Sequence, residues 1–159
     1  MSDLARISDQ PSVRVNRLLS APIDEVYAAW TDPAFMCRWF SPTGRAEVEV
    51  DVRVGGSLRV VMLGDGMRID HTGEYLVVEP PRRLIFTWNS PYTGSESSIV
   101  TVVLTPQGER THLALSHDRL PQETTESHEG GWTSIVAHLA AALGGSMSPH
   151  QEDLTPNGC

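Results

Sequence analysis

The stretch that decides how this chain folds is Gly131-Trp132-Thr133-Ser134-Ile135-Val136-Ala137-His138-Leu139-Ala140-Ala141-Ala142-Leu143-Gly144-Gly145. Its apolar residues recur at 132, 135, 136, 139 and 143, which is the spacing of one face of an α-helix. The Gly144-Gly145 pair that follows is a typical helix stop. No other segment has so long a helical pattern, so we expect one long helix around which the rest of the chain is organised.

The start of this helix is less sharply marked than its end. Thr124, Thr125 and Ser127 can each cap a helix, and we therefore place the helix at about 124–144. Gly130 and Gly131 lie inside it, where each Gly costs up to about 1 kcal/mol relative to Ala. Such a pair indicates either a hinge in the helix or a close contact with a neighbouring segment.

The segments before the helix alternate with the period of β-strands. Residues 13–19 form a first strand, and Pro22 and Pro33 then open two short helices, the second running through Trp39. From Arg45 to His117 apolar and polar residues alternate in about five or six further strands separated by turns. In the longest of these, one face carries Met67, Ile69, His71, Gly73, Tyr75 and Val77. The pattern predicts an antiparallel sheet with one dry face, which the long helix covers.

Composition and charge narrow the class of protein. The 159 residues predict a single domain, which we place at 12–145 between flexible termini at 1–11 and 146–159. The net charge of −8 argues against a nucleic-acid partner, which would require a basic surface. No apolar run approaches the roughly 18 residues of a membrane span, and the first residues lack a signal-peptide core. We expect a cytoplasmic protein.

Several short motifs occur in an order and spacing that resemble one known family. They are Ala21-Pro22 with Val26 and Trp30-Thr31-Asp32-Pro33, Trp39 and Pro42, Asp51-x-Arg53-x-Gly55-Gly56, Leu84-Ile85-Phe86-Thr87-Trp88, and Gly131-Trp132 followed by spaced leucines. Together they resemble the heat-shock-protein-90 ATPase activator-like family of the START-like (birch-pollen-allergen-like, SRPBCC) superfamily. The resemblance covers roughly residues 12–144.

This resemblance implies an α+β helix-grip fold. A curved antiparallel sheet of about six strands would wrap around the long C-terminal helix, with two short helices after the first strand. Members mostly bind hydrophobic or amphipathic small molecules in a cavity between the sheet and the helix, and some are polyketide cyclases or related enzymes. The superfamily has no universal catalytic motif, so no catalytic residue is carried over.

Strand alternation and the helix pattern select the candidate binding residues. These are the residues expected on the dry, concave face of the sheet or opposite it: Trp39, Met62, His71, Tyr75, Phe86, Trp88, His117, Trp132 and Leu139. A cavity lined by aromatic side chains with a few polar groups is typical of a small-molecule site. The alternative is that these side chains simply fill the core. A polar atom on a dry face still needs a partner, which a ligand or a water molecule can supply.

Three functions remain open from the sequence. The first is binding of a small hydrophobic or aromatic molecule without catalysis. The second is a cyclase, dehydratase or hydrolase acting on an aromatic or polyketide-like substrate, with His71, His117 and Tyr75 as acid–base groups. The third is a co-chaperone-like interaction module; the family's eukaryotic co-chaperones carry an additional N-terminal domain, for which this chain has no room.

The sequence offers little for a metal, a cofactor or a large protein interface. The histidines lack ligand spacing such as His-x-x-x-His, so we expect no metal and no cofactor. The outward residues of the predicted sheet are mostly charged, which argues against an extended apolar docking surface. Thr101, Val103 and Ala114 are outward residues without a charge, and one edge of the sheet could pair there in a homodimer.

Overall fold

The computed structural model describes residues 12–93 and 97–143. The elements follow in the order β1 (Val13–Leu19), α1 (Ile23–Thr31), α2 (Pro33–Met36), β2 (Ala46–Val50), β3 (Ser57–Gly64), β4 (Met67–Glu79), β5 (Arg83–Trp88), β6 (Ser98–Gln107), β7 (Arg110–Asp118), η2 (Gln122–Thr124) and α3 (Thr125–Leu143). The termini predicted to be flexible, 1–11 and 146–159, lie outside the described residues. In the described parts, no helix is long and apolar enough to cross a bilayer.

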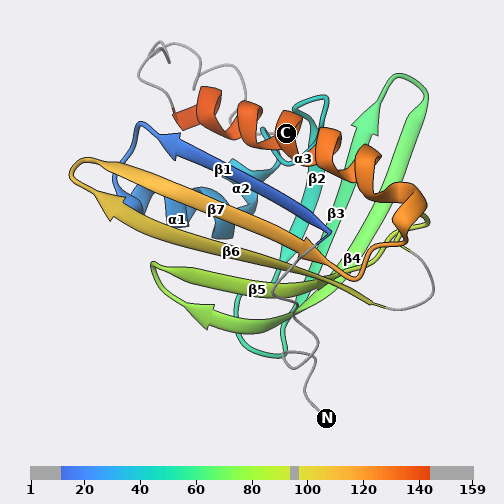
Figure 1. Cartoon of the computed structure of the whole chain (residues 1–159), viewed down its shortest axis with the longest axis horizontal. Coiled ribbons are helices and arrows are strands. Elements are labelled where there is room, and N and C mark those ends of the chain that lie inside the picture. Colours follow the sequence, from blue (N-terminus) through green and yellow to red (C-terminus); the bar gives the residue numbers. More distant parts are fainter. Residues whose placement is uncertain (1–11, 94–96, 144–159) are drawn as a thin grey trace.

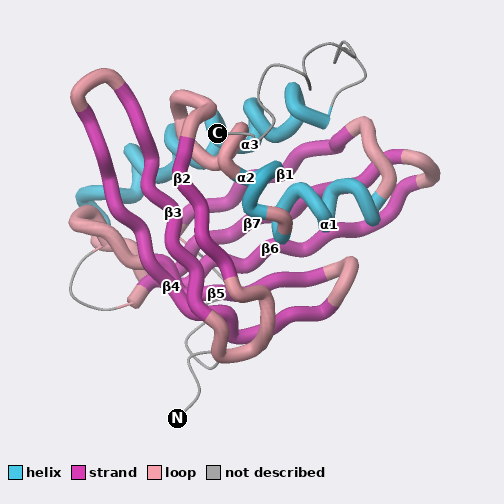
Figure 2. Tube along the Cα trace, turned by 180° about the vertical axis from the view of Figure 1, so that it is seen from behind, coloured by secondary structure: helices cyan, strands magenta, loops and turns pink. Residues whose placement is uncertain are grey.

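The strands form one antiparallel sheet. Its order is β1-β7-β6-β5-β4-β3-β2, so the two edges are the first strand and the strand that follows the short helices. The sheet has seven strands where we expected about six. Figures 1 and 2 show it curving around the molecule, with α3 running across it. The α+β helix-grip fold predicted from the sequence is therefore confirmed.

Helix α3 packs onto the sheet through one apolar face. Trp132, Ile135, Val136 and Leu139 are its buried residues, and they have the i, i+3, i+4, i+7 spacing of the sequence pattern. Burying each such side chain contributes roughly 1.5–3 kcal/mol, which stabilises the helix against the sheet. The helix begins at Thr125, one residue after the predicted start at 124.

The two short helices pack beside α3 on the same core. Val26, Ala29 and Trp30 are buried on α1, which packs against β6 and β7. Asp32 caps α2 by accepting a hydrogen bond from the Ala34 amide at 3.1 Å. The prediction that this helix extends through Trp39 is wrong, because α2 ends at Met36.

One strand contains an irregularity that the alternation pattern did not predict. The pairing of β4 with β5 shifts between Tyr75 and Val77, so that Val77 lies opposite Ile85 and Val78 lies opposite Leu84. A β-bulge of this kind moves the following residues to the other face of the strand. Val78 packs against the core. The expectation that Val77 shares the inner face is therefore wrong.

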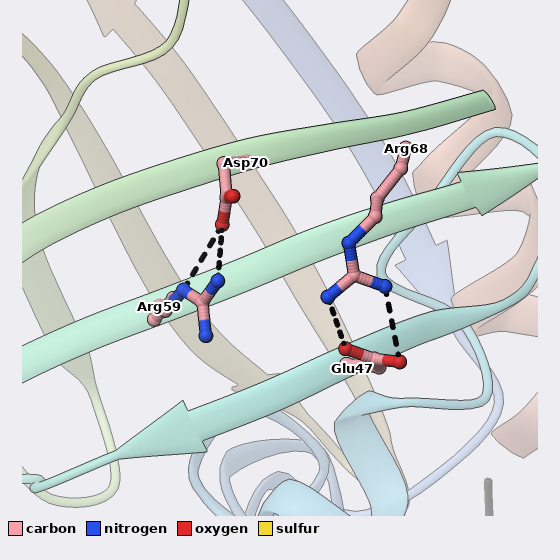
Figure 3. Close-up of polar contacts among 4 residues, drawn as sticks. All are labelled: Glu47, Arg59, Arg68 and Asp70. Atoms are coloured by element: carbon pink, nitrogen blue, oxygen red, sulfur yellow. Dashed lines mark hydrogen bonds and ion pairs between the residues drawn. The ribbon is translucent and has the colours of Figure 1, made fainter.

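The outer face of β2, β3 and β4 carries ion pairs that join different strands, one of them across the intervening β3. Arg68 of β4 pairs with Glu47 of β2 at 2.9 Å, and Arg59 of β3 pairs with Asp70 of β4 at 2.9 Å (Figure 3). All four side chains remain about half exposed, so each pair contributes little stability by itself. Charged side chains along an edge strand also oppose pairing with another sheet edge.

A shallow hollow of about 250 Å³ lies on the outer face at the other side of the sheet. Its lining includes Thr101, Val103 and Ala114, the residues on which we based the possible homodimer. Thr101 Oγ1 is buried there without a hydrogen-bond partner among the described residues. The expectation that these residues lie at an edge of the sheet is wrong, because β6 and β7 are each paired on both sides. The homodimer itself remains a prediction.

Candidate binding cavity between the sheet and α3

A cavity of about 260 Å³ lies between the inner face of the sheet and the N-terminal half of α3. The sheet and the adjoining loops contribute Pro42, Met62, His71, Trp88 and Tyr92. Helix α3 contributes Ser127, His128, Gly131, Trp132 and Ile135. The volume lies just below the usual range for small-molecule sites, and the mixture of aromatic walls with a few polar groups is typical of such sites.

The structure divides the candidate residues between the cavity and the core. Met62, His71, Trp88 and Trp132 line the cavity. The others are buried in the body of the protein and are not among the lining residues: Trp39, Tyr75, Phe86, His117 and Leu139. Trp39, for example, donates its indole N–H to the Ala29 carbonyl at 3.1 Å and stacks on Phe40. Its role is to join α1 to the segment that follows α2.

Sequence reasoning missed several lining residues. They are Pro42, Tyr92, Ser127, His128, Gly131 and Ile135. A signal for the helical ones was present, because 128, 131, 132 and 135 have i, i+3, i+4, i+7 spacing. Extending the apolar face of α3 by one turn towards its N-terminus would have found His128. Pro42 and Tyr92 lie in loops, and no local pattern predicts where a loop returns to a cavity.

Gly131 forms part of the cavity wall without being crowded. A Cβ added at Gly131 or at its neighbour Gly130 would meet no heavy atom within 4 Å. The close contact that we considered for this pair is therefore wrong. Only Gly131 of the two lines the cavity, and this difference makes the pair useful for testing the site.

A buried chain of hydrogen bonds lies directly behind the cavity. Trp132 donates its indole N–H to Nδ1 of His117 at 2.9 Å, and Nε2 of His117 lies 2.8 Å from Oγ of Ser98. The Ser98 hydroxyl in turn donates to the backbone carbonyl of Trp88. An indole N–H can only donate, so Nδ1 of His117 accepts and Nε2 carries the proton. The chain ties α3 to β7, β6 and β5 and connects the segments that carry the two cavity tryptophans.

His117 is consequently a structural residue. Its side chain is fully buried, both ring nitrogens have partners, and burial together with the nearby His128 and His71 holds its pKa well below the ordinary value of 6.5. The acid–base pair of His71 and His117 that we considered required both rings to face one cavity. His117 is not among the residues that line it.

His71, unlike His117, lines the cavity. Its ring stacks on Trp88, with centroids 4.6 Å apart and planes 21° apart, and its side chain is almost completely buried. Nδ1 has no hydrogen-bond partner of normal geometry among the described residues. Burial lowers the pKa of His71 to about 4, although backbone groups of Val60 and Ile69 raise it in part. At neutral pH His71 is an uncharged imidazole.

His128 presents a second imidazole from the helix. Its Nδ1 lies 2.8 Å from the backbone carbonyl of Thr124, one turn earlier. A carbonyl only accepts, so Nδ1 carries a proton, and in the neutral ring Nε2 holds a lone pair. The ring also meets His117 edge-on, with centroids 5.3 Å apart.

Phe40 packs against both tryptophans of the cavity wall. It stacks on Trp88 with a centroid separation of 5.4 Å and meets Trp132 edge-on at 5.8 Å. It was not among the candidates from the sequence, because it follows a short helix in a turn where no periodicity indicates which way it faces. Nε2 of His138 lies 2.9 Å from the carbonyl oxygen of Pro42, a lining residue, and this contact links α3 to the loop that carries Pro42.

The lining residues do not form a metal site or a charged site. No group of three or more His, Cys, Asp or Glu in the described ranges 12–93 and 97–143 could hold a metal ion. The described lining residues also include no carboxylate and no arginine. The cavity therefore combines apolar and aromatic surface with the hydrogen-bonding side chains of His, Ser and Tyr.

Comparison with known proteins addresses the family and the fold. The family described as "Activator of Hsp90 ATPase homolog 1-like protein" matches residues 20–144. The chain belongs to this family. The match spans both short helices, all strands from β2 to β7, and α3, so it includes every residue that lines the cavity. The family resemblance and the SRPBCC-like fold expected from the sequence are confirmed.

Solved structures give the same result for the fold. Protein NE0264 from Nitrosomonas europaea is 22% identical over 93% of this chain and 99% of its own, with a TM-score of 0.73. CalU16 from Micromonospora echinospora is 28% identical, with coverage of 91% and 82% and a TM-score of 0.66. DynU16, from the dynemicin biosynthetic locus, is 32% identical over 82% of this chain but only 46% of its own, with a TM-score of 0.70. The search of curated proteins gave no match.

Proposed function

We propose that this member of the Activator of Hsp90 ATPase homolog 1-like family binds a small hydrophobic or aromatic molecule in the cavity between the sheet and α3. The observation that carries the proposal is the cavity itself, about 260 Å³ with Trp88 and Trp132 in its walls. A close-packed core leaves few voids larger than a water molecule. A space of this size with aromatic walls is suited to a ligand.

Two further observations support binding rather than packing alone. The cavity wall carries neutral and aromatic surface together with hydrogen-bonding side chains, because His71, Ser127 and His128 are among the lining residues, and such groups can fix the orientation of a ligand. The walls are also fixed in place by the hydrogen-bond chain from Trp132 to Trp88, which pre-organises the cavity and lowers the cost of binding. CalU16 and DynU16 share the fold, and DynU16 comes from a biosynthetic locus, which favours a small organic molecule as the ligand.

Catalysis is the weaker alternative. The acid–base pair that we considered from the sequence requires His117, but His117 is bonded to Ser98 and does not line the cavity. The described lining residues contain no carboxylate that could replace it. Co-chaperone-like activity is also less favoured, since the outer face of β2 to β4 is covered by ion pairs instead of an apolar patch. We therefore propose binding without turnover.

The test uses the two neighbouring glycines of α3. N-phenyl-1-naphthylamine, an uncharged dye that fluoresces in apolar surroundings, is titrated into the wild type, Gly131→Leu and Gly130→Leu. Leucine at 131 takes up cavity space, whereas leucine at 130 lies outside the lining residues. Both substitutions improve helix propensity, so both variants should fold.

We expect the wild type and Gly130→Leu to bind the dye with one site and similar affinity. Gly131→Leu should bind at least about tenfold more weakly, which corresponds to about 1.4 kcal/mol. The proposal is overturned if neither the dye nor members of a wider lipid and aromatic panel bind the wild type. It is also overturned if the two leucine variants bind equally well.

A further inference from the structure

The polar groups that face the cavity are unevenly distributed between hydrogen-bond donors and acceptors. On α3, Ser127 Oγ and His128 Nδ1 both direct their protons to the Thr124 carbonyl, at 3.0 and 2.8 Å. The hydroxyl oxygen of Ser127 and Nε2 of a neutral His128 are then left as acceptors. The Trp132 N–H is not available to a ligand, because it is held by His117. The helix therefore offers a ligand acceptors, and the ligand has to supply the donor.

The opposite wall provides a second imidazole. His71 lines the cavity with its ring flat against Trp88, and its Nδ1 is buried without a partner among the described residues. The other ring nitrogen, Nε2, is not among the buried atoms that lack a partner, and it is the candidate ring atom for a contact with a ligand. Tyr92 adds a hydroxyl at the mouth, but it is 54% exposed and so remains hydrated without a ligand.

Charge and shape limit the ligand further. The described lining residues contain no Arg, Asp or Glu, so a carboxylate or an ammonium group would be buried without a counter-ion. The two indole rings, with centroids 5.7 Å apart and planes tilted by 45°, contribute aromatic, apolar surface to the cavity wall. A flat, uncharged ring system fits these walls better than a flexible or ionic molecule.

We propose that the cavity selects an uncharged aromatic molecule that bears a hydroxyl group, and that this hydroxyl donates a hydrogen bond to Nε2 of His128 while its ring lies beside Trp88 and His71. This inference rests on the proposed binding function and goes beyond it by naming the chemical group that is recognised. The recognition is directional: a hydroxyl satisfies the acceptors of the helix, whereas a methyl ether of the same shape leaves them unpaired.

The test compares four related probes by isothermal titration at neutral pH: 2-naphthol, 2-methoxynaphthalene, naphthalene and 2-naphthoate. We expect 2-naphthol to bind about tenfold more tightly than the methyl ether, and 2-naphthoate to bind most weakly. His128→Phe should reduce the advantage of naphthol over the ether to within about twofold while leaving naphthalene binding intact. His112→Phe, a histidine that does not line the cavity, is the matched control and should keep the advantage.

The outcomes separate this inference from the proposed function. If none of the four probes binds the wild type, the inference fails, and the proposed function fails with it only if N-phenyl-1-naphthylamine and the wider panel do not bind either. If naphthalene binds but naphthol and its ether bind equally, or naphthoate binds best, only the inference is overturned. His128 is partly exposed on the helix, so His128→Phe should fold; His71→Phe is a second variant that should also reduce the preference for naphthol. Full selectivity in a folded His128→Phe variant overturns the inference.

Discussion

Trp132 donates its indole N–H to Nδ1 of His117 across 2.9 Å, and this bond joins the long helix to β7 inside the core. Because the indole can only donate, the bond also fixes which nitrogen of His117 carries the proton. That proton is directed to Ser98, whose hydroxyl is bonded to the carbonyl of Trp88. One buried imidazole thus links the segments that carry both tryptophans of the cavity.

Removing this imidazole should destabilise the protein. In His117→Phe the Trp132 N–H is left buried without a partner, which costs about 1–3 kcal/mol of unfolding free energy. In the double variant with Trp132→Phe, the orphaned donor is absent. We therefore expect the double variant to lose at least about 0.5 kcal/mol less than the sum of the single losses.

Urea denaturation of the wild type and the three variants measures this coupling. Trp30→Phe, combined with His117→Phe, serves as the control, because Trp30 is buried at another position and its own N–H has no partner among the described residues. The control pair should be additive within about 0.5 kcal/mol. Additivity in the Trp132 pair as well would contradict the structural role of this bond.

The two buried histidines, His71 and His117, predict how the stability of the fold depends on pH. Burial lowers the pKa of His71 to about 4 and holds that of His117 well below 6.5, so both are neutral when folded. Below pH 6.5 the unfolded chain binds protons that the folded chain does not, so stability rises with pH in this range. The contribution of the two histidines to the free energy of unfolding should be fully present above about pH 6.5 and decline as the pH falls towards 4.

Urea denaturation at several pH values between 7.5 and 5 measures this decline. Each histidine contributes roughly 1.4 kcal/mol per pH unit in the steep part of the range. The His71→Phe variant should show a shallower decline than the wild type, because it lacks one of the two groups. A wild-type stability that does not change between pH 7.5 and 5.5 would refute the prediction.

The sequence predicted the architecture well because each element has a strong period. The alternation of Leu84, Phe86 and Trp88 placed all three on the inner face, and the spacing from Trp132 to Leu139 identified the helix face that covers them. The prediction was wrong where a single residue changes the pattern. The bulge before Val77 alters the pairing by one residue, and no local composition marks it.

The candidate site was less predictable, because its chemistry depends on contacts between distant segments. Alternation placed His71 and His117 on the same dry face, yet one lines the cavity and the other is enclosed by Ser98 and Trp132. Which of them keeps an unpartnered nitrogen depends on the register of β6 against β7 and on the position of α3. Neither can be derived from spacing along the chain.

Glycine-to-alanine substitutions should have opposite signs at two positions. At Gly73 a Cβ would lie 1.8 Å from the backbone oxygen of Thr87, so Gly73→Ala has to displace β5. We expect a loss of about 1–3 kcal/mol or more. At Gly130 the Cβ would meet nothing within 4 Å, and Gly130→Ala should gain up to about 1 kcal/mol from helix propensity. Thermal unfolding of both variants beside the wild type tests this, and a neutral Gly73→Ala would contradict the close approach of β4 and β5.

Ligand binding should be reported by only two of the tryptophans. Trp88 and Trp132 line the cavity, whereas Trp30 and Trp39 are buried outside its lining. A ligand that enters the cavity should therefore change the fluorescence of the first pair. Trp30→Phe removes an indole whose N–H has no partner among the described residues, so it should fold and keep the ligand-induced change. Trp88→Phe should lose at least about half of that change.

The opposite result would contradict the proposed site. If the fluorescence change survives in Trp88→Phe and disappears in Trp30→Phe, the ligand binds elsewhere, on the side of α1. There Trp30 meets Trp39 and Phe40 edge-on, with ring centroids 4.7 and 5.5 Å apart.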